Sequence, residues 1–313
     1  MVDNRPTCVI CASQADFLLE KDGYSHFLCP ACGLVFVFPQ PTSAFLTDEI
    51  YSEKSGYQSN KTDDLNGYAP TKRQKALLSY LGKKIKGESL ATPLFLDVGC
   101  SNGEIMYLAQ KLGFQARGAE LNPRTANAAR ANGLDVFVGT LELAGYPDGI
   151  FDVVHIGDVI EHVPDPRALI VEARRVLKTA SGETPGGELI IATPNMNCFW
   201  AKITLSLWRL FRIPWSSSTP PHHLWQFSAD NLKLFLEENG FIVTGAWYNR
   251  TPSLKYEIGS LHLLKRWKKR RAASDFLFMA FSFGLYSLVF AVNRIWECLP
   301  VKRFDITMTA VKS

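Results

Sequence analysis

The sequence predicts an α/β protein with a mostly parallel sheet, and three observations support that fold class. A short apolar run at 94–96 is followed by a glycine-rich turn and then by apolar residues at helical spacing. Further short apolar runs alternate with amphipathic segments, as in chains whose strands and helices alternate. Two C-x-x-C pairs near the N-terminus and two apolar stretches late in the chain lie outside this alternation. We therefore expect a small metal-binding module before the sheet and apolar helical insertions within it.

Length and composition are those of an ordinary globular chain. The 313 residues suffice for one large domain or two small ones, and 47% of them are apolar, which allows a sizeable core. A net charge of +4 permits an anionic partner but does not require a nucleic acid. The first residues lack the apolar segment of a secretory signal, so we expect a cytoplasmic protein.

Residues 1–40 hold four of the seven cysteines in two C-x-x-C pairs, seventeen residues apart: Cys8, Cys11, Cys29 and Cys32. This spacing is typical of a zinc ribbon, in which four thiolates surround one structural Zn²⁺; four unrelated thiols are the alternative. A module this small needs the metal because it buries too little apolar surface alone. Its cations are only Arg5 and Lys21, which argues against nucleic acid as a partner.

The stretch from residue 94 to residue 104 predicts a nucleotide-binding corner. Asp97 stands where the first strand ends, and Gly99 and Gly103 bracket a tight turn before a helix. Glycines let the backbone approach a ligand, and the helix start offers free N–H groups. The G-x-x-x-G spacing differs from the G-x-G-x-x-G of dinucleotide-binding folds. On this motif alone, a turn in some other α/β fold is the alternative interpretation.

The other elements follow in order. We expect a polar linker or lid at 41–69, a core at 70–250 with an insertion at 196–220, a basic and apolar helical insertion at 251–300, and a last strand within 301–313. Helices are predicted at 70–86 and 166–178. Strands are predicted at 115–120, 134–138, 149–156, 187–193, 241–247 and 304–311.

Acidic residues follow two of these strands. Glu120 ends the second strand, twenty-three residues after Asp97, where an acid in nucleotide-binding α/β folds accepts hydrogen bonds from both ribose hydroxyls. Asp158, Glu161 and His162 follow the strand at 149–156, at the edge where open α/β sheets bind ligands. Two carboxylates and an imidazole thus lie within five residues.

Together these motifs resemble the class I S-adenosylmethionine (SAM) methyltransferases over residues 70–245 and the last ten residues. The resemblance rests on the Asp97–Gly103 turn, on Glu120, on Asp158-x-x-Glu161-His162 and on two later motifs, Ala192-Thr-Pro-Asn195 and His223-x-x-x-Phe227. It implies a Rossmann-like seven-stranded sheet and SAM as the cofactor. The cofactor-binding residues that it implies are Asp97, Gly99, Ser101, Gly103, Glu120, Leu121, Thr140, Leu141 and Asp158. Thr140 departs from the acidic residue that the family often has there.

Methyl transfer from a sulfonium to a hydroxyl, an amine or an activated carbon needs the acceptor positioned and its proton removed. The candidates for this role are His162, His222, His223, Asp158 and Glu161; His155 lies in a buried strand pattern and fits the core. The acid-x-x-Glu-His pattern is similar to that of the ubiquinone-biosynthesis O-methyltransferases and the small-RNA 3′-end methyltransferases. That resemblance implies Mg²⁺ or another divalent cation at Asp158, Glu161 and His162, with His222 or His223 as a further ligand. A purely structural turn is the alternative.

Two segments exceed the minimal fold, at 197–215 and 265–296. The first has aromatic and aliphatic residues at helical spacing, and the second joins the basic run 265–271 to seventeen uncharged residues at 276–292. A single membrane span conflicts with the last strand returning to the same sheet. We therefore expect peripheral contact with the cytoplasmic membrane face. A lid or a dimer interface is the alternative.

The sequence thus predicts a methyltransferase acting on a small, amphiphilic, lipid-linked or glycan-related acceptor, with O-methylation favoured over methylation of carbon or nitrogen. Two other functions stay open at this stage. The first is an RNA methyltransferase that uses the ribbon to grip RNA, and the second is a non-catalytic SAM-binding scaffold on a membrane. The few cations of the ribbon argue against the first, and the intact glycine turn argues against the second.

Overall fold

A computed structural model describes residues 5–52, 63–88, 92–182, 186–212, 218–250 and 273–313. The chain forms two compact units, and each is described by itself. The first unit comprises Met1–Phe38, Pro194–Leu232 and Trp247–Ile306, and the second comprises Pro39–Thr193, Lys233–Ala246 and Thr307–Ser313.

A seven-stranded sheet has the order β10-β11-β8-β7-β4-β5-β6. Its strands are β4 Leu94–Val98, β5 Gln115–Glu120, β6 Asp135–Val138, β7 Val153–Gly157, β8 Glu188–Pro194, β10 Phe241–Asn249 and β11 Asp305–Lys312. The pairs β4–β5, β4–β7, β5–β6 and β7–β8 are parallel. Nearly all residues of β4, β7 and β8 are buried, as expected of parallel strands covered on both faces. The predicted α/β fold is confirmed.

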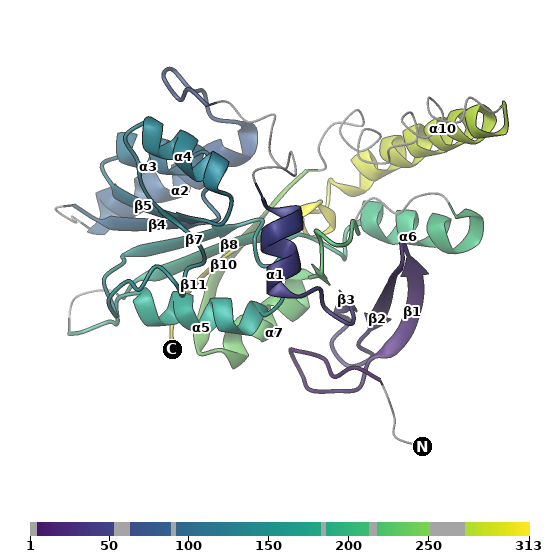
Figure 1. Ribbon diagram of the computed structural model, residues 1–313, viewed down its shortest axis with the longest axis horizontal. Helices are drawn as coiled ribbons and strands as arrows, with labels where there is room; N and C mark the ends of the chain where they lie inside the picture. The colour runs from purple at the N-terminus through teal and green to yellow at the C-terminus, as the bar shows by residue number, and fades with distance from the viewer. Residues whose placement is uncertain (1–4, 53–62, 89–91, 183–185, 213–217, 251–272) are drawn as a thin grey trace. The chain divides into compact units, whose positions relative to one another are not determined.

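Helices cover both faces of this sheet: α2 Lys72–Glu88, α3 Glu104–Lys111, α4 Pro123–Ala131, α5 Pro166–Val176 and α7 Ala229–Glu238. Figure 1 shows α2, α3 and α4 on one face and α5 on the other. Helices α4 and α5 begin alike, each with a proline in its first turn and a side-chain cap. Asn122 accepts from the backbone N–H of Arg124, and Asp165 accepts from those of Arg167 and Ala168.

The N-terminal residues form a second, antiparallel sheet with the order β1-β2-β3-β9. Three of its strands lie within the predicted ribbon: β1 Asp16–Lys21, β2 Tyr24–Leu28 and β3 Val35–Val37. The fourth strand, β9 Trp225–Gln226, comes from nearly two hundred residues later, and its pairing with β3 was not predicted. Two residues are too short a run for a sequence pattern to identify as a strand.

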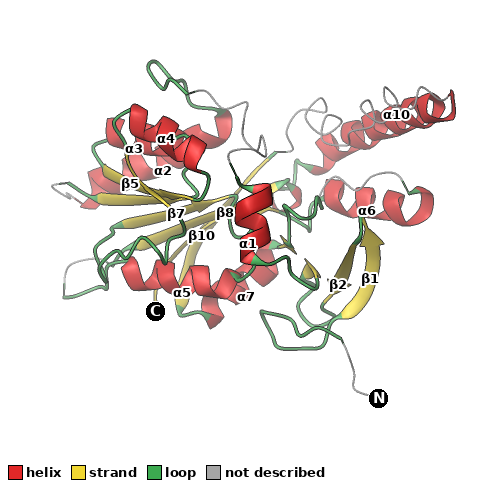
Figure 2. Ribbon diagram, in the orientation of Figure 1, coloured by secondary structure: helices red, strands yellow, loops and turns green. Residues whose placement is uncertain are grey.

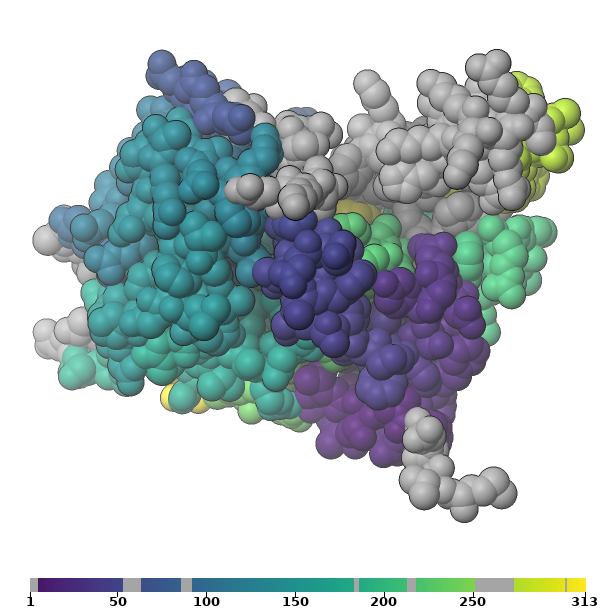
Figure 3. All heavy atoms as spheres, viewed as in Figure 1, coloured from purple at the N-terminus to yellow at the C-terminus, as the bar shows by residue number. Residues whose placement is uncertain are grey.

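Two helices, α6 Phe199–Phe211 and α10 Ala273–Trp296, pack together in the first unit. Figure 2 shows the two red helices side by side. Trp200 is fully buried and contacts the rings of Tyr286 and Phe290 edge-on, at centroid distances of 5.5 and 6.0 Å. The same apolar cluster includes Leu19 and Val35 of the ribbon, and Figure 3 shows ribbon atoms beside those of α6.

One helix within the described residues, α10, is long and apolar enough to cross a membrane by length and composition alone. Strands β10 and β11, which precede and follow it in the chain, are neighbours in one sheet. The chain that leaves this sheet after β10 therefore returns to it with β11. The expectation against a single membrane span rested on this return.

Three details differ from the predicted elements. Part of the expected loop at 41–69 is helical, as α1 Ser43–Phe45 and the π-helical turn η1 Leu46–Ile50, because Thr42 caps the backbone N–H of Phe45 and Leu46 is buried. The strand predicted from residue 149 begins at Val153, since Phe151 forms only an isolated bridge. Helix α7 was not predicted. The basic run 265–271 and residues 213–215 lie outside the described residues.

Candidate functional site

The turn after β4 contains three residues with left-handed backbone conformations: Gly99, Ser101 and Gly103, with φ of +70°, +53° and +83°. A Cβ added to Gly99 would lie 2.3 Å from Cγ2 of Val159, so only glycine fits there without a shift. The backbone N–H of Gly99 donates to the carbonyl of Ala119 in β5 at 2.8 Å. The predicted turn therefore lies at the carboxyl ends of β4 and β5, with Gly103 directly before α3.

Glu120 closes this turn from the end of β5. One carboxylate oxygen accepts a hydrogen bond from the backbone N–H of Ser101 at 2.7 Å, and the other accepts from that of Asn122 at 2.8 Å. Burial raises the pKa of Glu120, while the two N–H donors favour its ionised form. Each oxygen keeps a further lone pair, so the carboxylate can still accept from a pair of ligand hydroxyls.

Asp97 and His155 form a buried pair across neighbouring strands. They are partners in the β4–β7 register, and the Nδ1 atom of His155 lies 2.7 Å from Oδ1 of Asp97. The two residues are only 3% and 7% exposed. The bond joins β4 to β7 just below the glycine turn, which agrees with a core position for His155.

The remaining predicted cofactor residues lie at the same edge of the sheet. Leu121 follows β5 and is half-buried, whereas Thr140 and Leu141 follow β6, the first exposed and the second buried. The backbone N–H of Gly139 donates to the carbonyl of Glu120 at 2.9 Å, so the ends of β5 and β6 are held together.

Helix α2 contributes a cation that the sequence did not single out. Both terminal nitrogens of Arg73 donate to the carboxylate of Asp158, at 2.6 and 2.7 Å. Asp158 directly follows β7 and has a left-handed backbone with φ of +55°. The pair is partly exposed, so it is accessible to a ligand at the sheet edge. A single arginine in a lysine-rich helix gives no sequence signal, because its partner lies 85 residues away.

A second group of side chains ties the segment before α2 to the start of α3. The hydroxyl of Tyr68 donates to Glu104 at 2.7 Å, and the amide of Gln74 donates to the same carboxylate oxygen at 3.0 Å. Burial and the nearby Glu104 raise the pKa of Tyr68 to about 12, so the phenol keeps its proton. The segment that precedes α2 is thus fixed close to the glycine turn.

Glu161 and His162 form an acid–base group with two further side chains. Glu161 is 1% exposed and accepts a hydrogen bond from the hydroxyl of Thr193 at 2.9 Å. Its other oxygen lies 3.8 Å from Nε2 of His162, whose Nδ1 is 3.2 Å from the hydroxyl of Tyr51. Burial, with the nearby Asp158 charge, raises the pKa of Glu161 well above its usual value. The carboxyl of Glu161, the imidazole of His162 and the phenol of Tyr51 are therefore spatial neighbours, in that order, within the second unit.

This arrangement does not support a divalent cation at Asp158, Glu161 and His162. Both oxygens of Asp158 accept from Arg73, and Glu161 lies where burial favours its protonated form. His222 and His223 belong to the first unit, on the turn before β9.

The four predicted zinc ligands do come together in the first unit. The Sγ atoms of Cys8 and Cys32 are 3.6 Å apart, those of Cys11 and Cys29 are 3.4 Å apart, and all four lie within 4.8 Å of one another. Tetrahedral Zn²⁺ with Zn–S bonds of about 2.3 Å needs sulfur atoms about 3.8 Å apart, so the cluster fits this ion. Hydrogen bonding from the Cys32 thiol lowers the pKa of Cys8 to about 5.

Comparison with known proteins agrees with the fold. A sequence model described as a methyltransferase domain matches residues 68–245. Two relatives are ubiquinone biosynthesis O-methyltransferases, from Xanthomonas oryzae (34% identical; 38% of this chain and 48% of the relative) and Xanthomonas campestris (32%; 50% and 65%). The matches thus span about half to two thirds of these relatives. The structure of magnesium protoporphyrin IX methyltransferase from Synechocystis is similar with a TM-score of 0.51 at 12% identity, over 87% of this chain and all of that chain.

The chain therefore belongs to the methyltransferase domain family. Its sheet is the Rossmann-like sheet of the class I SAM-dependent methyltransferases, as the resemblance in sequence implied. Sequence reasoning found the glycine turn and the acidic residues, and it missed Arg73, Tyr51 and Tyr68. These three precede the turn in the chain and belong to no recognisable motif.

Proposed function

We propose that this protein is an O-methyltransferase that transfers the methyl group of SAM to a hydroxyl of a small, amphiphilic acceptor. The observation that carries the proposal is the corner formed by the Gly99 turn and Glu120 at the carboxyl ends of β4 and β5. Open α/β sheets bind nucleotide ligands at this edge. The family match at 68–245 supports the reaction class.

The residues at this edge suit the three parts of SAM. Glu120 would accept from the ribose hydroxyls, and the glycine turn would let the backbone approach the ligand. Arg73 and Asp158 offer a cation and an anion side by side, which suits the carboxylate and the ammonium group of the methionine part. The bound cofactor would supply an electrophilic methyl group on sulfur.

The hydroxyl acceptor must lose its proton as the new bond forms, and we assign the role of base to His162. Its Nδ1 atom lies beside the Tyr51 hydroxyl and its Nε2 atom faces Glu161. Burial and the nearby Asp158 raise the pKa of Glu161 well above its usual value, so its carboxyl can hold a proton beside the imidazole. The two Xanthomonas relatives are O-methyltransferases, which supports oxygen as the acceptor atom.

We also propose peripheral contact with a membrane through α6 and α10, which would bring the protein close to an amphiphilic acceptor. The outer face of the two helices exposes large apolar side chains, among them Leu277 (67%), Leu288 (63%) and Leu210 (73%). Lys202 and Arg209 on α6 add positive charge, which favours anionic headgroups. Such a surface lies in the interfacial region of a membrane rather than across it.

Incubation with methyl-labelled SAM and a fractionated cell extract tests the function. We expect label in a lipid or small-molecule fraction, and a large loss of label with Glu120→Gln. The exposed Glu142→Gln variant is the matched control and should transfer as the wild type does. Label confined to RNA would contradict the proposal, as would the absence of any transfer by protein that binds SAM.

A further inference from the structure

The turn that carries His222 and His223 is attached to the ribbon at both of its ends. At its start, the Lys21 ammonium donates to the carbonyl of Ser218 at 2.7 Å, and Nε2 of His26 lies 2.7 Å from the Ser218 hydroxyl. Lys21 is 6% exposed, and His26 and Ser218 are fully buried. Buried polar groups need partners, so these bonds constrain the position of Ser218 strongly.

The bond between His26 and Ser218 has a defined direction. Nδ1 of His26 lies 3.1 Å from the carbonyl of Tyr24, which can only accept, so Nδ1 carries the proton. Nε2 therefore accepts from the Ser218 hydroxyl. The amide of Gln226 also lies within reach of Ser218, at 3.5 Å, and donates to the carbonyl of His223 at 3.2 Å.

At its other end, the turn continues into β9 of the ribbon sheet. Trp225 pairs with Phe36 of β3, and their rings stack at a centroid distance of 5.5 Å. Just beyond, the side chain of Asn231 donates to the carbonyl of Cys32, one of the four clustered cysteines, at 3.4 Å. The ribbon thus holds the chain before and after His222 and His223.

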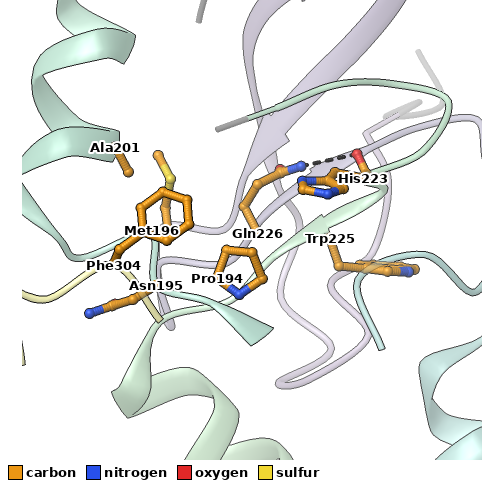
Figure 4. A pocket seen from close by; sticks show the side chains of 8 residues that line it. All are labelled: Pro194, Asn195, Met196, Ala201, His223, Trp225, Gln226 and Phe304. Atoms are coloured by element: carbon orange, nitrogen blue, oxygen red, sulfur yellow. Dashed lines mark hydrogen bonds between the residues drawn. The ribbon is translucent and has the colours of Figure 1, made fainter. Parts of the chain in front are cut away.

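The turn also lines a narrow pocket in the first unit. Figure 4 shows Gln226, with its amide directed to the carbonyl of His223, beside Trp225 and Met196 in the pocket wall. The pocket includes Pro194, the last residue of β8.

We propose that the ribbon is a positioning element for His222 and His223, with Ser218 as the residue through which it acts. Binding of Zn²⁺ to the cysteine cluster then controls the position of these two histidines, and the affinity for SAM does not depend on it. The inference rests on the proposed function for its catalytic meaning. The attachment itself is a property of the first unit alone.

NMR of the full chain with ¹³C-labelled histidine rings tests this. The chain has six histidines, and His155, bonded to Asp97 in the other unit, is an internal control. Removal of Zn²⁺ with a chelator should shift or broaden the ring signals of His26, His222 and His223 and leave that of His155 in place. Unchanged signals from His222 and His223 in zinc-free protein would overturn the proposal.

A pair of serine variants tests it without disturbing the metal. Ser218→Ala removes only the buried hydroxyl, and it should shift the His222 and His223 signals while metal analysis still finds one bound zinc. Ser206→Ala, which removes an exposed hydroxyl on α6, should leave the spectrum unchanged. Equal spectra for the two variants would refute a positioning role, even if chelation had unfolded the chain.

Calorimetry with SAM on the same samples separates this inference from the proposed function. We expect the same SAM affinity in the zinc-loaded, zinc-free and Ser218→Ala proteins. Weaker SAM binding on zinc removal would contradict a zinc effect that is confined to the first unit. If no sample bound SAM, the proposed function would fail, whatever the histidine signals did.

Discussion

Glu161 is a buried carboxyl group whose raised pKa makes a testable difference to stability. In the folded chain it holds its proton at pH values where an unfolded chain has released it. Between the unfolded and folded pKa values the native state binds more protons than the unfolded state, so the contribution of Glu161 to stability falls as the pH rises. That contribution is fully present below the unfolded pKa.

The variant Glu161→Gln lacks this titration. As the pH rises above about 4.5, its free energy of unfolding should therefore increase relative to that of the wild type. The limiting slope is about 1.4 kcal/mol per pH unit, and urea unfolding at several pH values measures it. The exposed Glu142→Gln should follow the wild type in parallel. A difference between Glu161→Gln and the wild type that did not change with pH would contradict the raised pKa.

At the scale of elements, the glycine turn depends on a close approach between two loops. Gly99→Ala introduces a Cβ that clashes with Val159 and is also strained at φ of +70°. Gly133→Ala has a similar φ of +76° but nothing within 4 Å of the added atom. We expect Gly99→Ala to lower the free energy of unfolding by about 1–3 kcal/mol more than Gly133→Ala does.

The added Cβ clashes mainly with one atom, Cγ2 of Val159, so a variant that lacks this atom is the control. In a Val159→Ala background the substitution Gly99→Ala should cost distinctly less, since the methyl group in its way is gone. Urea denaturation of the four proteins in this cycle measures the coupling. Independent, additive costs would mean that packing against Val159 does not explain the glycine.

The outer face of α10 should decide whether the protein binds membranes. Replacing both Leu277 and Leu288 by glutamate removes two exposed apolar side chains and adds negative charge. Since burial of one leucine contributes about 1.5–3 kcal/mol, the loss of two costs at least about 3 kcal/mol, and we expect binding to weaken by more than about 100-fold. Flotation with vesicles of mixed anionic and neutral lipid measures this loss.

The control for that experiment is Leu143→Glu, because Leu143 is equally exposed (72%) but lies in the second unit. It should float as the wild type does. If the α10 variant also floated like the wild type, α10 would not be a membrane-binding surface, and a lid or an interface between two copies would better explain its apolar face.

At the scale of the whole molecule, the sheet was predictable because local patterns determine it. Strands β4 and β8 carry mostly apolar residues between clear turn signals, and the glycines around residue 100 mark the corner. Glu120 and Asp158 could be placed at the ligand edge because each follows a predicted strand. Predicting the positions of these two residues requires only the alternation of strands and helices along the chain.

Contacts between distant segments could not be predicted in this way. The pairing of Arg73 with Asp158 spans 85 residues, and that of Lys21 with Ser218 spans 197. Strand β9 is defined by its partner β3 rather than by its own two residues. The pattern of residue types along the chain holds no information on such pairs. The partners of the side chains around the glycine turn, and the attachment of the His222–His223 turn, are therefore seen only in the structure.

We propose that the Gly99 turn and Glu120 form the binding corner for SAM. Isothermal titration of SAM into the wild type, Glu120→Gln and Glu142→Gln tests this proposal. We expect saturable heat for the wild type and Glu142→Gln, and an affinity about 10–100-fold lower for Glu120→Gln, because a charge-assisted hydrogen bond contributes about 1.5–3 kcal/mol. No heat with the wild type, or equal affinities for all three proteins, would contradict it.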